Sequence, residues 1–434
     1  MPVGLDDYEF VRATGIIDSL VTSGELIGET VVDTSLLGEH GSGASLLLEH
    51  PRLPFISYPY EWSFSALQAA ALLHLDIQLA ALKKDVTLTD ATAYNIQFVG
   101  PKPVFIDSLS FRRYTDGEYW AGHRQFFEQF VNPLLLRSAV GIPHNAWYRG
   151  ALEGISAEDL SHALPWTSRL SWNVLTNVFL QARLQRMSGS GDAIEKAKTR
   201  KLPRIGFDQI LHGLRKWIVR LEPKTSGKTV WEDYASNNSY ADEEVANKRN
   251  FITDFVSETK PQLILDIGCN TGDYSAVALE NGAGLAIGFD FDHGALDYGF
   301  RRARRESLNF LPLHLDAANP SPSQGWLQVE RQGFQERAKG DAVMGLALIH
   351  HIAVAKNLPL AQVIDWLVDM APQGVIEFVP KTDPMVQRLL QIREDLFDDY
   401  NQESFETYLS GRARVVKSAS VSSSGRILYW FDRG

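Results

Sequence analysis

One segment, LILDIGCNTGDYS at residues 263–275, constrains the fold of this chain more than any other. Its first half predicts a buried strand that ends near Asp266, and a helical pattern follows. Between them Gly268, Asn270 and Gly272 predict a tight turn, and the two glycines, which have no Cβ, let the backbone come close to a ligand. Such a ligand would lie at the carboxyl end of the first strand of an open α/β sheet.

The spacing of the glycines indicates the kind of ligand. Gly-x-x-x-Gly differs from the Gly-x-Gly-x-x-Gly of dinucleotide sites, and the chain has no Gly-x-x-x-x-Gly-Lys phosphate loop. The loop therefore predicts a ligand without a diphosphate.

The rest of this half alternates short apolar runs with helical patterns, which predicts an α/β fold with a doubly wound, Rossmann-like parallel sheet. Its last part, VVKSASVSSSGRILYWFDR, predicts a terminal antiparallel hairpin around Ser-Ser-Gly. The expected parallel strands are Leu263–Ile267, Leu285–Phe289, Asn309–Leu315, Ala342–Ala347 and Val375–Val379.

Two further acids follow the second and third expected strands. Asp290 ends LAIGFDFD, where a carboxylate can accept the hydroxyls of a ribose, and Asp316 follows in HLDAA, where it can meet an adenine amino group. Three acids at successive strand ends predict a nucleoside site. The plainer alternative is that Asp266 and Asp290 cap helices or turns.

In this order, Asp266-Ile-Gly268-Cys-Asn270-Thr-Gly272, Asp290 and Asp316 resemble motifs I to III of the class I S-adenosylmethionine-dependent methyltransferases. The resemblance covers about residues 240–434. It implies that Asp266 lies near the amino acid end of the cofactor, that the glycines admit the methionine moiety, and that Asp290 holds the ribose.

Tyr240 and Lys248 precede the first strand, where this class often has a helix that closes over the cofactor. Both are therefore candidates for cofactor binding, and Lys248 could pair with the methionine carboxylate. Lys248 could equally be a solvated surface lysine, since lysines are mostly exposed.

The methyl acceptor should lie beyond the fourth and fifth strands. DAVMGLALIHH ends with His350 and His351, and GVIEFVPKTD contains Glu377. A histidine can act as a general base near neutral pH, and Glu377 could orient it or act instead. The alternative is a structural role for each. Two adjacent histidines cannot easily chelate one ion, so no metal is expected.

The segments ALIHHIAVAKNLPL and EFVPKTDPMVQRLLQIREDLF resemble a bacterial group of two-part methyltransferases that includes nodulation proteins. That resemblance implies a small-molecule or glycan acceptor.

The amino-terminal half contains LTDATAYNIQFVGPKPVFIDSLSF, in which Asp90, Asn95 and Asp107 resemble the catalytic loop and metal-binding Asp of kinase-like phosphotransferases. The segment departs from that family, because Ser-Leu follows Asp107 and no lysine precedes Lys83. We therefore expect an α+β kinase-like remnant that binds substrate or acts as a scaffold. The alternative is that the three residues belong to turns and caps.

Two polar stretches, 187–200 and 223–244, read as linkers on either side of an amphipathic helical pattern at 201–222. They divide the chain into an accessory domain at 1–185, a linker with a connecting helix at 186–239, and a methyltransferase domain at 240–434.

The composition of the chain bears on its cellular location and on its binding partners. The net charge of −11 opposes nucleic acid binding, and the single Cys269 and the acidic start favour a cytoplasmic protein. The apolar window 65–82 contains polar residues, which favours a buried helix over a membrane span.

These features predict an enzyme that moves a methyl group from S-adenosyl-L-methionine to oxygen or nitrogen of a small molecule or glycan. Two alternatives stay open: a non-catalytic two-domain nucleotide-binding scaffold, and a bifunctional kinase and methyltransferase. The sequence leaves the oligomeric state open.

Overall fold

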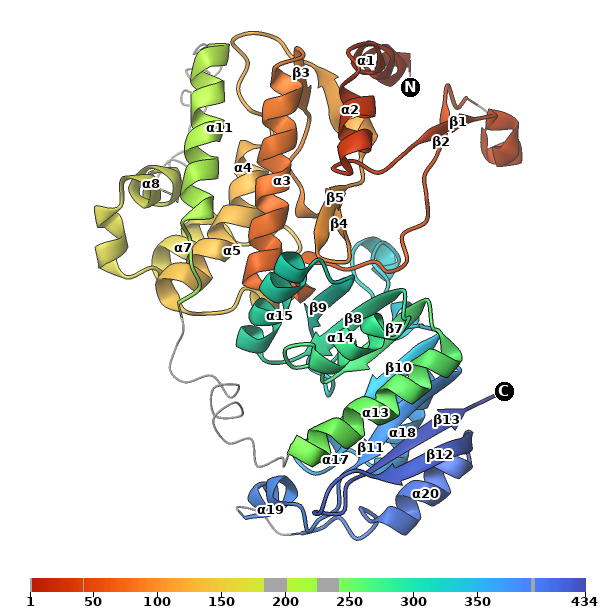
Figure 1. The fold of residues 1–434 in the computed structure, drawn as a ribbon. Helices are drawn as coiled ribbons and strands as arrows, with labels where there is room; N and C mark the ends of the chain where they lie inside the picture. Colours follow the sequence, from red (N-terminus) through yellow and green to blue (C-terminus); the bar gives the residue numbers. More distant parts are fainter. Residues whose placement is uncertain (1, 42, 183–200, 225–241, 392–394) are drawn as a thin grey trace. The chain divides into compact units, whose positions relative to one another are not determined.

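The computed structural model describes residues 2–41, 43–182, 201–224, 242–391 and 395–434, and it divides into two compact units (Figure 1). The units are Met1–Ser226 and Gly227–Gly434. Most of the two predicted linkers lies outside the described residues.

The second unit is built on a seven-stranded sheet in the order β12-β13-β11-β10-β7-β8-β9. The five strands β7 to β11 pair in parallel, and β13 pairs antiparallel with both β11 and β12. The predicted doubly wound sheet and its terminal antiparallel hairpin are therefore present. The strands are β7 (Leu263–Ile267), β8 (Leu285–Asp290), β9 (Phe310–His314), β10 (Ala342–Gly345), β11 (Gln373–Phe378), β12 (Arg414–Ser420) and β13 (Ile427–Asp432).

Helices follow the parallel strands and cover the sheet (Figure 1). Strands β7 and β10 are almost fully buried, which explains their near-continuous apolar sequences. The helical segments are α13 (Asp242–Thr259), α14 (Asp273–Glu280), α15 (His293–Glu306), η9 (Trp326–Gln328), α16 (Phe334–Arg337), α17 (Ile349–Ala353), α18 (Leu360–Val368), α19 (Pro384–Leu390) and α20 (Gln402–Ser410).

The fourth strand is shorter than predicted. It ends at Gly345, and His350 and His351 lie in helix α17 and not at a strand end. The break follows from Ala347, whose φ of 49° is incompatible with a continuing strand.

The first unit combines helices with three two-stranded sheets, β1-β2, β3-β6 and β4-β5. The strands are β1 (Thr30–Val32), β2 (Leu47–Glu49), β3 (Val86–Leu88), β4 (Ile96–Val99), β5 (Lys102–Phe105) and β6 (Phe111–Arg113). The α-helices are α1 (Pro2–Ala13), α2 (Ile16–Ser23), α3 (Phe64–Leu82), α4 (His123–Phe126), α5 (Asn132–Leu135), α6 (Asn145–Gly150), α7 (Ala157–Ala163), α8 (Trp172–Val174) and α11 (Arg204–Val219). Short 3-10 or π segments are η1 (Thr34–Gly41), η2 (Pro59–Glu61), η3 (Ala93–Asn95), η4 (Ser108–Ser110), η5 (Phe127–Val131), η6 (Leu136–Val140), η7 (Trp166–Leu170) and η8 (Leu175–Phe179).

Helix α3 forms the centre of the first unit. By length and composition it is the one helix among the described residues that could cross a membrane, and 78% of that apolar window is buried inside the structure. The core helix of a globular unit passes the same test.

The predicted helix at 201–222 is present as α11, and it packs along α3 within the first unit. Gln68 Nε2 donates to the carbonyls of Ile218 and Leu221 at 2.8 and 2.9 Å, and Arg215 pairs with Asp76 at 2.6 Å. These contacts make α11 part of that unit, whereas the sequence assigned it to the connecting segment.

Candidate cofactor and acceptor site

The glycine loop between β7 and α14 is held against the end of β8 by its own backbone. The N–H groups of Gly268 and Cys269 donate to the carbonyl of Phe289 at 2.7 and 3.1 Å. The next N–H, from Asn270, donates to the Asp290 carboxylate at 2.8 Å. These hydrogen bonds hold the glycine loop and Asp290 together at the carboxyl end of β8.

Gly268 and Gly272 are needed for their backbone conformations, with φ of 83° and 82°. A Cβ on Gly272 would lie 2.3 Å from Cε1 of the buried Phe310, and a Cβ on Gly268 would lie 3.3 Å from Cδ1 of Leu348. The backbone at both positions is therefore packed as closely as glycine allows. The two glycines are therefore required by the packing of the protein itself.

Asp266 lies beneath this loop with 2% of its surface exposed. Its Oδ2 accepts a hydrogen bond from the Ser275 hydroxyl of α14 at 2.6 Å. Burial raises its pKa to about 7, and the nearby charges of Asp290 and Asp273 add to the increase, while the Ser275 hydrogen bond opposes it. Asp266 thus ties the end of β7 to the start of α14.

Asp290 ends β8 and is half-buried. Its two oxygens accept the N–H groups of Asn270 and Asp292 at 2.8 and 2.9 Å, and burial raises its pKa. A carboxylate offers about four acceptor positions, so this one can also accept hydroxyl groups such as those of a ribose. The residues present fit a nucleoside ligand.

Asp316 lies two residues beyond β9 and is also half-buried. It accepts the N–H of Ala318 at 3.1 Å, which makes it a turn residue, and Lys356 Nζ lies 3.9 Å from its Oδ1. Tyr240 lies outside the described residues.

Lys248 lies in the interior of the second unit. It is 3% exposed on α13, and its ammonium lies 2.7 and 2.9 Å from the two carboxylate oxygens of Glu377. Lys248 is therefore not a solvated surface lysine but part of a buried ion pair with β11, and its contact with a cofactor stays a prediction.

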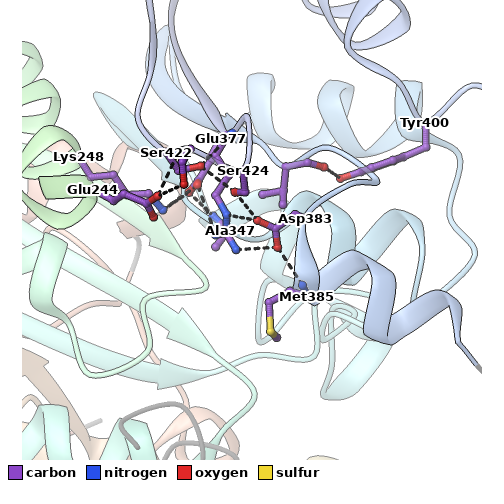
Figure 2. A network of polar contacts seen from close by, with 12 residues as sticks. Glu244, Lys248, Ala347, Glu377, Asp383, Met385, Tyr400, Ser422 and Ser424 are labelled. Atoms are coloured by element: carbon purple, nitrogen blue, oxygen red, sulfur yellow. Dashed lines mark hydrogen bonds and ion pairs between the residues drawn. The ribbon is translucent and has the colours of Figure 1, made fainter. Parts of the chain in front are cut away.

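Glu377 is fully buried and belongs to a larger polar network (Figure 2). Its Oε2 accepts the N–H of Ala347 at 2.8 Å, and Arg426 Nη1 lies 3.6 Å from its Oε1. Arg426 in turn donates to both oxygens of Asp383 at 2.7 and 3.0 Å. Sequence reasoning missed Arg426, because nothing local shows that a residue of the β12–β13 turn returns to the ends of β10 and β11.

The two histidines lie in α17, and their ring centres are 4.2 Å apart. His350 is fully buried, and neither of its ring nitrogens has a hydrogen-bond partner among the described residues. Burial, then the charges of His351, Arg426 and Lys248, hold its pKa well below the usual range, so its ring is neutral. Burial also lowers the pKa of the half-buried His351. Neutral imidazoles can accept a proton.

In the first unit the structure brings the three predicted residues together. The Asn95 amide donates to Asp90 Oδ1 at 3.2 Å and to Asp107 Oδ2 at 3.1 Å. Burial and the charge of Asp107 raise the pKa of Asp90, and Asp107 also caps Leu109 N–H. Within the described parts of the chain, no group of three or more His, Cys, Asp or Glu side chains could hold a metal.

Comparison with known proteins gives the family. The chain is 47% identical over 427 residues to the nodulation protein NoeA of Rhizobium meliloti (strain 1021), covering 98% of this chain and 90% of that protein. It belongs to the NoeA family. No protein-family model matches the chain.

Solved structures similar to this NoeA-family chain match about half of it. They include the magnesium protoporphyrin IX methyltransferase of Synechocystis with bound SAH (15% identity, TM-score 0.33, 47% of this chain, 93% of that one). Another is the N-methyltransferase NodS of Bradyrhizobium japonicum (14% identity, TM-score 0.32, 44% and 97%). The second unit has the doubly wound sheet and the terminal antiparallel hairpin that the sequence predicted.

Proposed function

We propose that this protein transfers a methyl group from S-adenosyl-L-methionine to oxygen or nitrogen of a small molecule or glycan. The observation that carries the proposal is the glycine loop, whose Asn270 N–H binds the Asp290 carboxylate while Gly268 and Gly272 supply the positive φ angles and the close packing that shape the turn. This edge of the sheet combines a tight backbone cradle with an acceptor for hydroxyl groups.

In this proposal Asp290 accepts the ribose hydroxyls, and Gly268, Asn270 and Gly272 admit the methionine moiety. Asp266 supports the loop from below through Ser275. Asp316 and Tyr240 are further candidates for contact with the cofactor. The cofactor, when bound, supplies an electrophilic methyl group on a sulfonium.

His350 and His351 are the proposed proton acceptors for the nucleophile. Their rings are adjacent and neutral, and burial, which lowers both pKa values, also makes each ring a weaker proton acceptor than a solvated histidine, most of all the fully buried His350. The half-buried His351 is the more open of the two to an acceptor molecule.

The proposed acceptor class draws support from the relative, which is called a nodulation protein. We further propose a cytoplasmic protein that binds neither nucleic acid nor a membrane surface, in line with its net charge of −11 and its buried α3. The first unit would then bind substrate or act as a scaffold.

The first test is calorimetry with S-adenosylhomocysteine. Asp290→Ala removes acceptors for two hydroxyl groups, a loss of about 1.5–3 kcal/mol, or roughly 10- to 150-fold in affinity. Asp292→Ala is the matched control, because Asp292 caps α15 by accepting the N–H groups of Gly294 and Ala295. Equal affinity in the wild type and Asp290→Ala would remove Asp290 from the site.

The second test separates an enzyme from a binding protein. Labelled S-adenosyl-L-methionine is incubated with the protein and an extract of its own cells, and transfer of label to a metabolite or glycan is measured. Tight cofactor binding without any transfer in such extracts would favour the non-catalytic scaffold.

A further inference from the structure

The ion pair between Lys248 and Glu377 joins two distant parts of the second unit. Lys248 comes from α13 and Glu377 from β11, and both are at least 97% buried. Separating a buried ion pair leaves two uncompensated charges, so the contact at 2.7 Å couples the position of α13 to that of β11. Near the same end of α13, the Glu244 carboxylate accepts the N–H of Ser423 at 3.0 Å (Figure 2).

Glu377 also controls the backbone that leads to the histidines. Its Oε2 accepts the N–H of Ala347, the residue whose φ of 49° ends β10 and starts the turn into α17. A non-glycine residue in this conformation is strained, and it persists only where its surroundings fix it. The Glu377 carboxylate supplies such a contact.

The turn fixed in this way lies against the proposed cofactor loop. Leu348 Cδ1 would be 3.3 Å from a Cβ on Gly268, and the Leu346 carbonyl oxygen would be 3.7 Å from it. On its other side the turn continues directly into Ile349 and His350 of α17. Residues 346–348 therefore connect the cofactor cradle with the proposed base.

The same geometry argues against Glu377 as the group that takes a proton from the acceptor. Its carboxylate has no exposed surface, and it contacts Lys248 and the Ala347 N–H, with Arg426 3.6 Å away. An acceptor molecule therefore has no access to this carboxylate.

We propose that Glu377 is a positioning residue: paired with Lys248, it holds the Ala347 N–H and so fixes the turn 346–348 between the cofactor loop and the histidine helix. This assignment rests on the proposed function for the identity of the cofactor. It gives Lys248 a role that does not require contact with that cofactor.

The test uses three variants of the full chain: Glu377→Gln, Lys248→Met and the double variant. The amide introduced by Glu377→Gln keeps an oxygen for the Ala347 N–H but removes the negative partner of Lys248. Lys248→Met leaves the buried Glu377 without its closest cation. The double variant removes both charges and keeps the acceptor for Ala347. Lys417→Met is the control, because it removes an exposed ion pair between β12 and α13, with Asp254 at 2.8 Å.

Two quantities are measured: the hydrogen exchange rates of peptides covering 346–352, and the affinity for S-adenosylhomocysteine. We expect each single variant to speed exchange in this segment by about tenfold or more and to weaken affinity by at least about fivefold. The double variant should recover both to within about twofold of the wild type, and Lys417→Met should change neither.

Unchanged exchange in both single variants, or no recovery in the double variant, would overturn the positioning role. Transfer activity adds a further readout once an acceptor is found: a lost general base cannot be restored by Lys248→Met, whereas a lost position can. If a single variant does not fold, the double variant still tests the proposal. Faster hydrogen exchange at 346–352 in the folded double variant than in the wild type would contradict the positioning role.

Failure of the proposed function looks different. If the wild type does not bind S-adenosylhomocysteine, the cofactor assignment is wrong. The exchange measurement needs no ligand, so it still shows whether Glu377 holds the turn.

Discussion

Asp266 offers a quantitative test of the cofactor edge, because its pKa is raised by burial from 3.8 to about 7. Between these values the folded protein holds a proton that the unfolded chain releases. The free energy of unfolding contributed by this group is therefore fully present below about pH 4 and is lost as the pH rises to about 7. At about 1.4 kcal/mol per pH unit, the loss amounts to roughly 4 kcal/mol.

The perturbation is Asp266→Asn, which cannot ionise and can still hydrogen-bond the Ser275 hydroxyl. We expect the variant to gain stability relative to the wild type as the pH rises from about 4 to about 8, by up to roughly 4 kcal/mol. The exposed Asp254→Asn on α13 is the control and should follow the wild type.

The assay is pulse proteolysis in urea at several pH values, with peptides from residues 242–434 followed separately from those of the first unit. This separation matters because two units need not unfold together. If the stability curves of Asp266→Asn and the wild type run parallel across this pH range, Asp266 does not carry the raised pKa and the reasoning is refuted.

Three other predictions concern the glycine loop, the histidines and the first unit. Gly272→Ala should lower the free energy of unfolding by roughly 2–5 kcal/mol, because the new Cβ strains the positive-φ backbone and collides with Phe310. The control Gly282→Ala should show only the backbone cost, and equal losses for the two variants in urea melts would contradict the prediction. His350→Ala or His351→Ala should lower methyl transfer by about 10²–10⁴ and leave S-adenosylhomocysteine affinity nearly unchanged, and full turnover in both variants would exclude a histidine base. The full chain should not hydrolyse ATP with magnesium, because kinases place a lysine from an early strand on the phosphates and this chain has no lysine before Lys83. ATP hydrolysis that disappears in Asp107→Ala would show that the protein is bifunctional.

The parallel strands and the hairpin could be predicted because each is a short apolar run that the sheet buries. Leu263–Ile267 has the predicted bounds, and the second and third strands differ by a residue at one or both ends. The glycine loop was equally readable, because its residue types are set by backbone conformations that few other residues adopt.

The residues around the ends of β10 and β11 were harder to predict from the sequence, for physical reasons. Ala347 takes a left-handed conformation that its residue type does not favour, so the apolar run hides the break between β10 and α17. Lys248 and Glu377 are 129 residues apart, and lysine is rarely buried, so no local pattern indicates their pairing. The resemblance to kinase-like phosphotransferases predicted that Asp90, Asn95 and Asp107 lie together, and the structure places them in hydrogen-bond contact. The kinase-like character of the first unit stays a prediction.

The position of β13 between β11 and β12 has a consequence for biosynthesis. The sheet receives an internal strand last, after β7 to β12 have left the ribosome. At about 5–20 residues per second, roughly 3–10 s separate the synthesis of β11 from that of β13. During that interval β11 presents unpaired backbone groups along a buried, apolar strand, which is the kind of edge that recruits other chains. We therefore expect aggregation to compete with folding in this window.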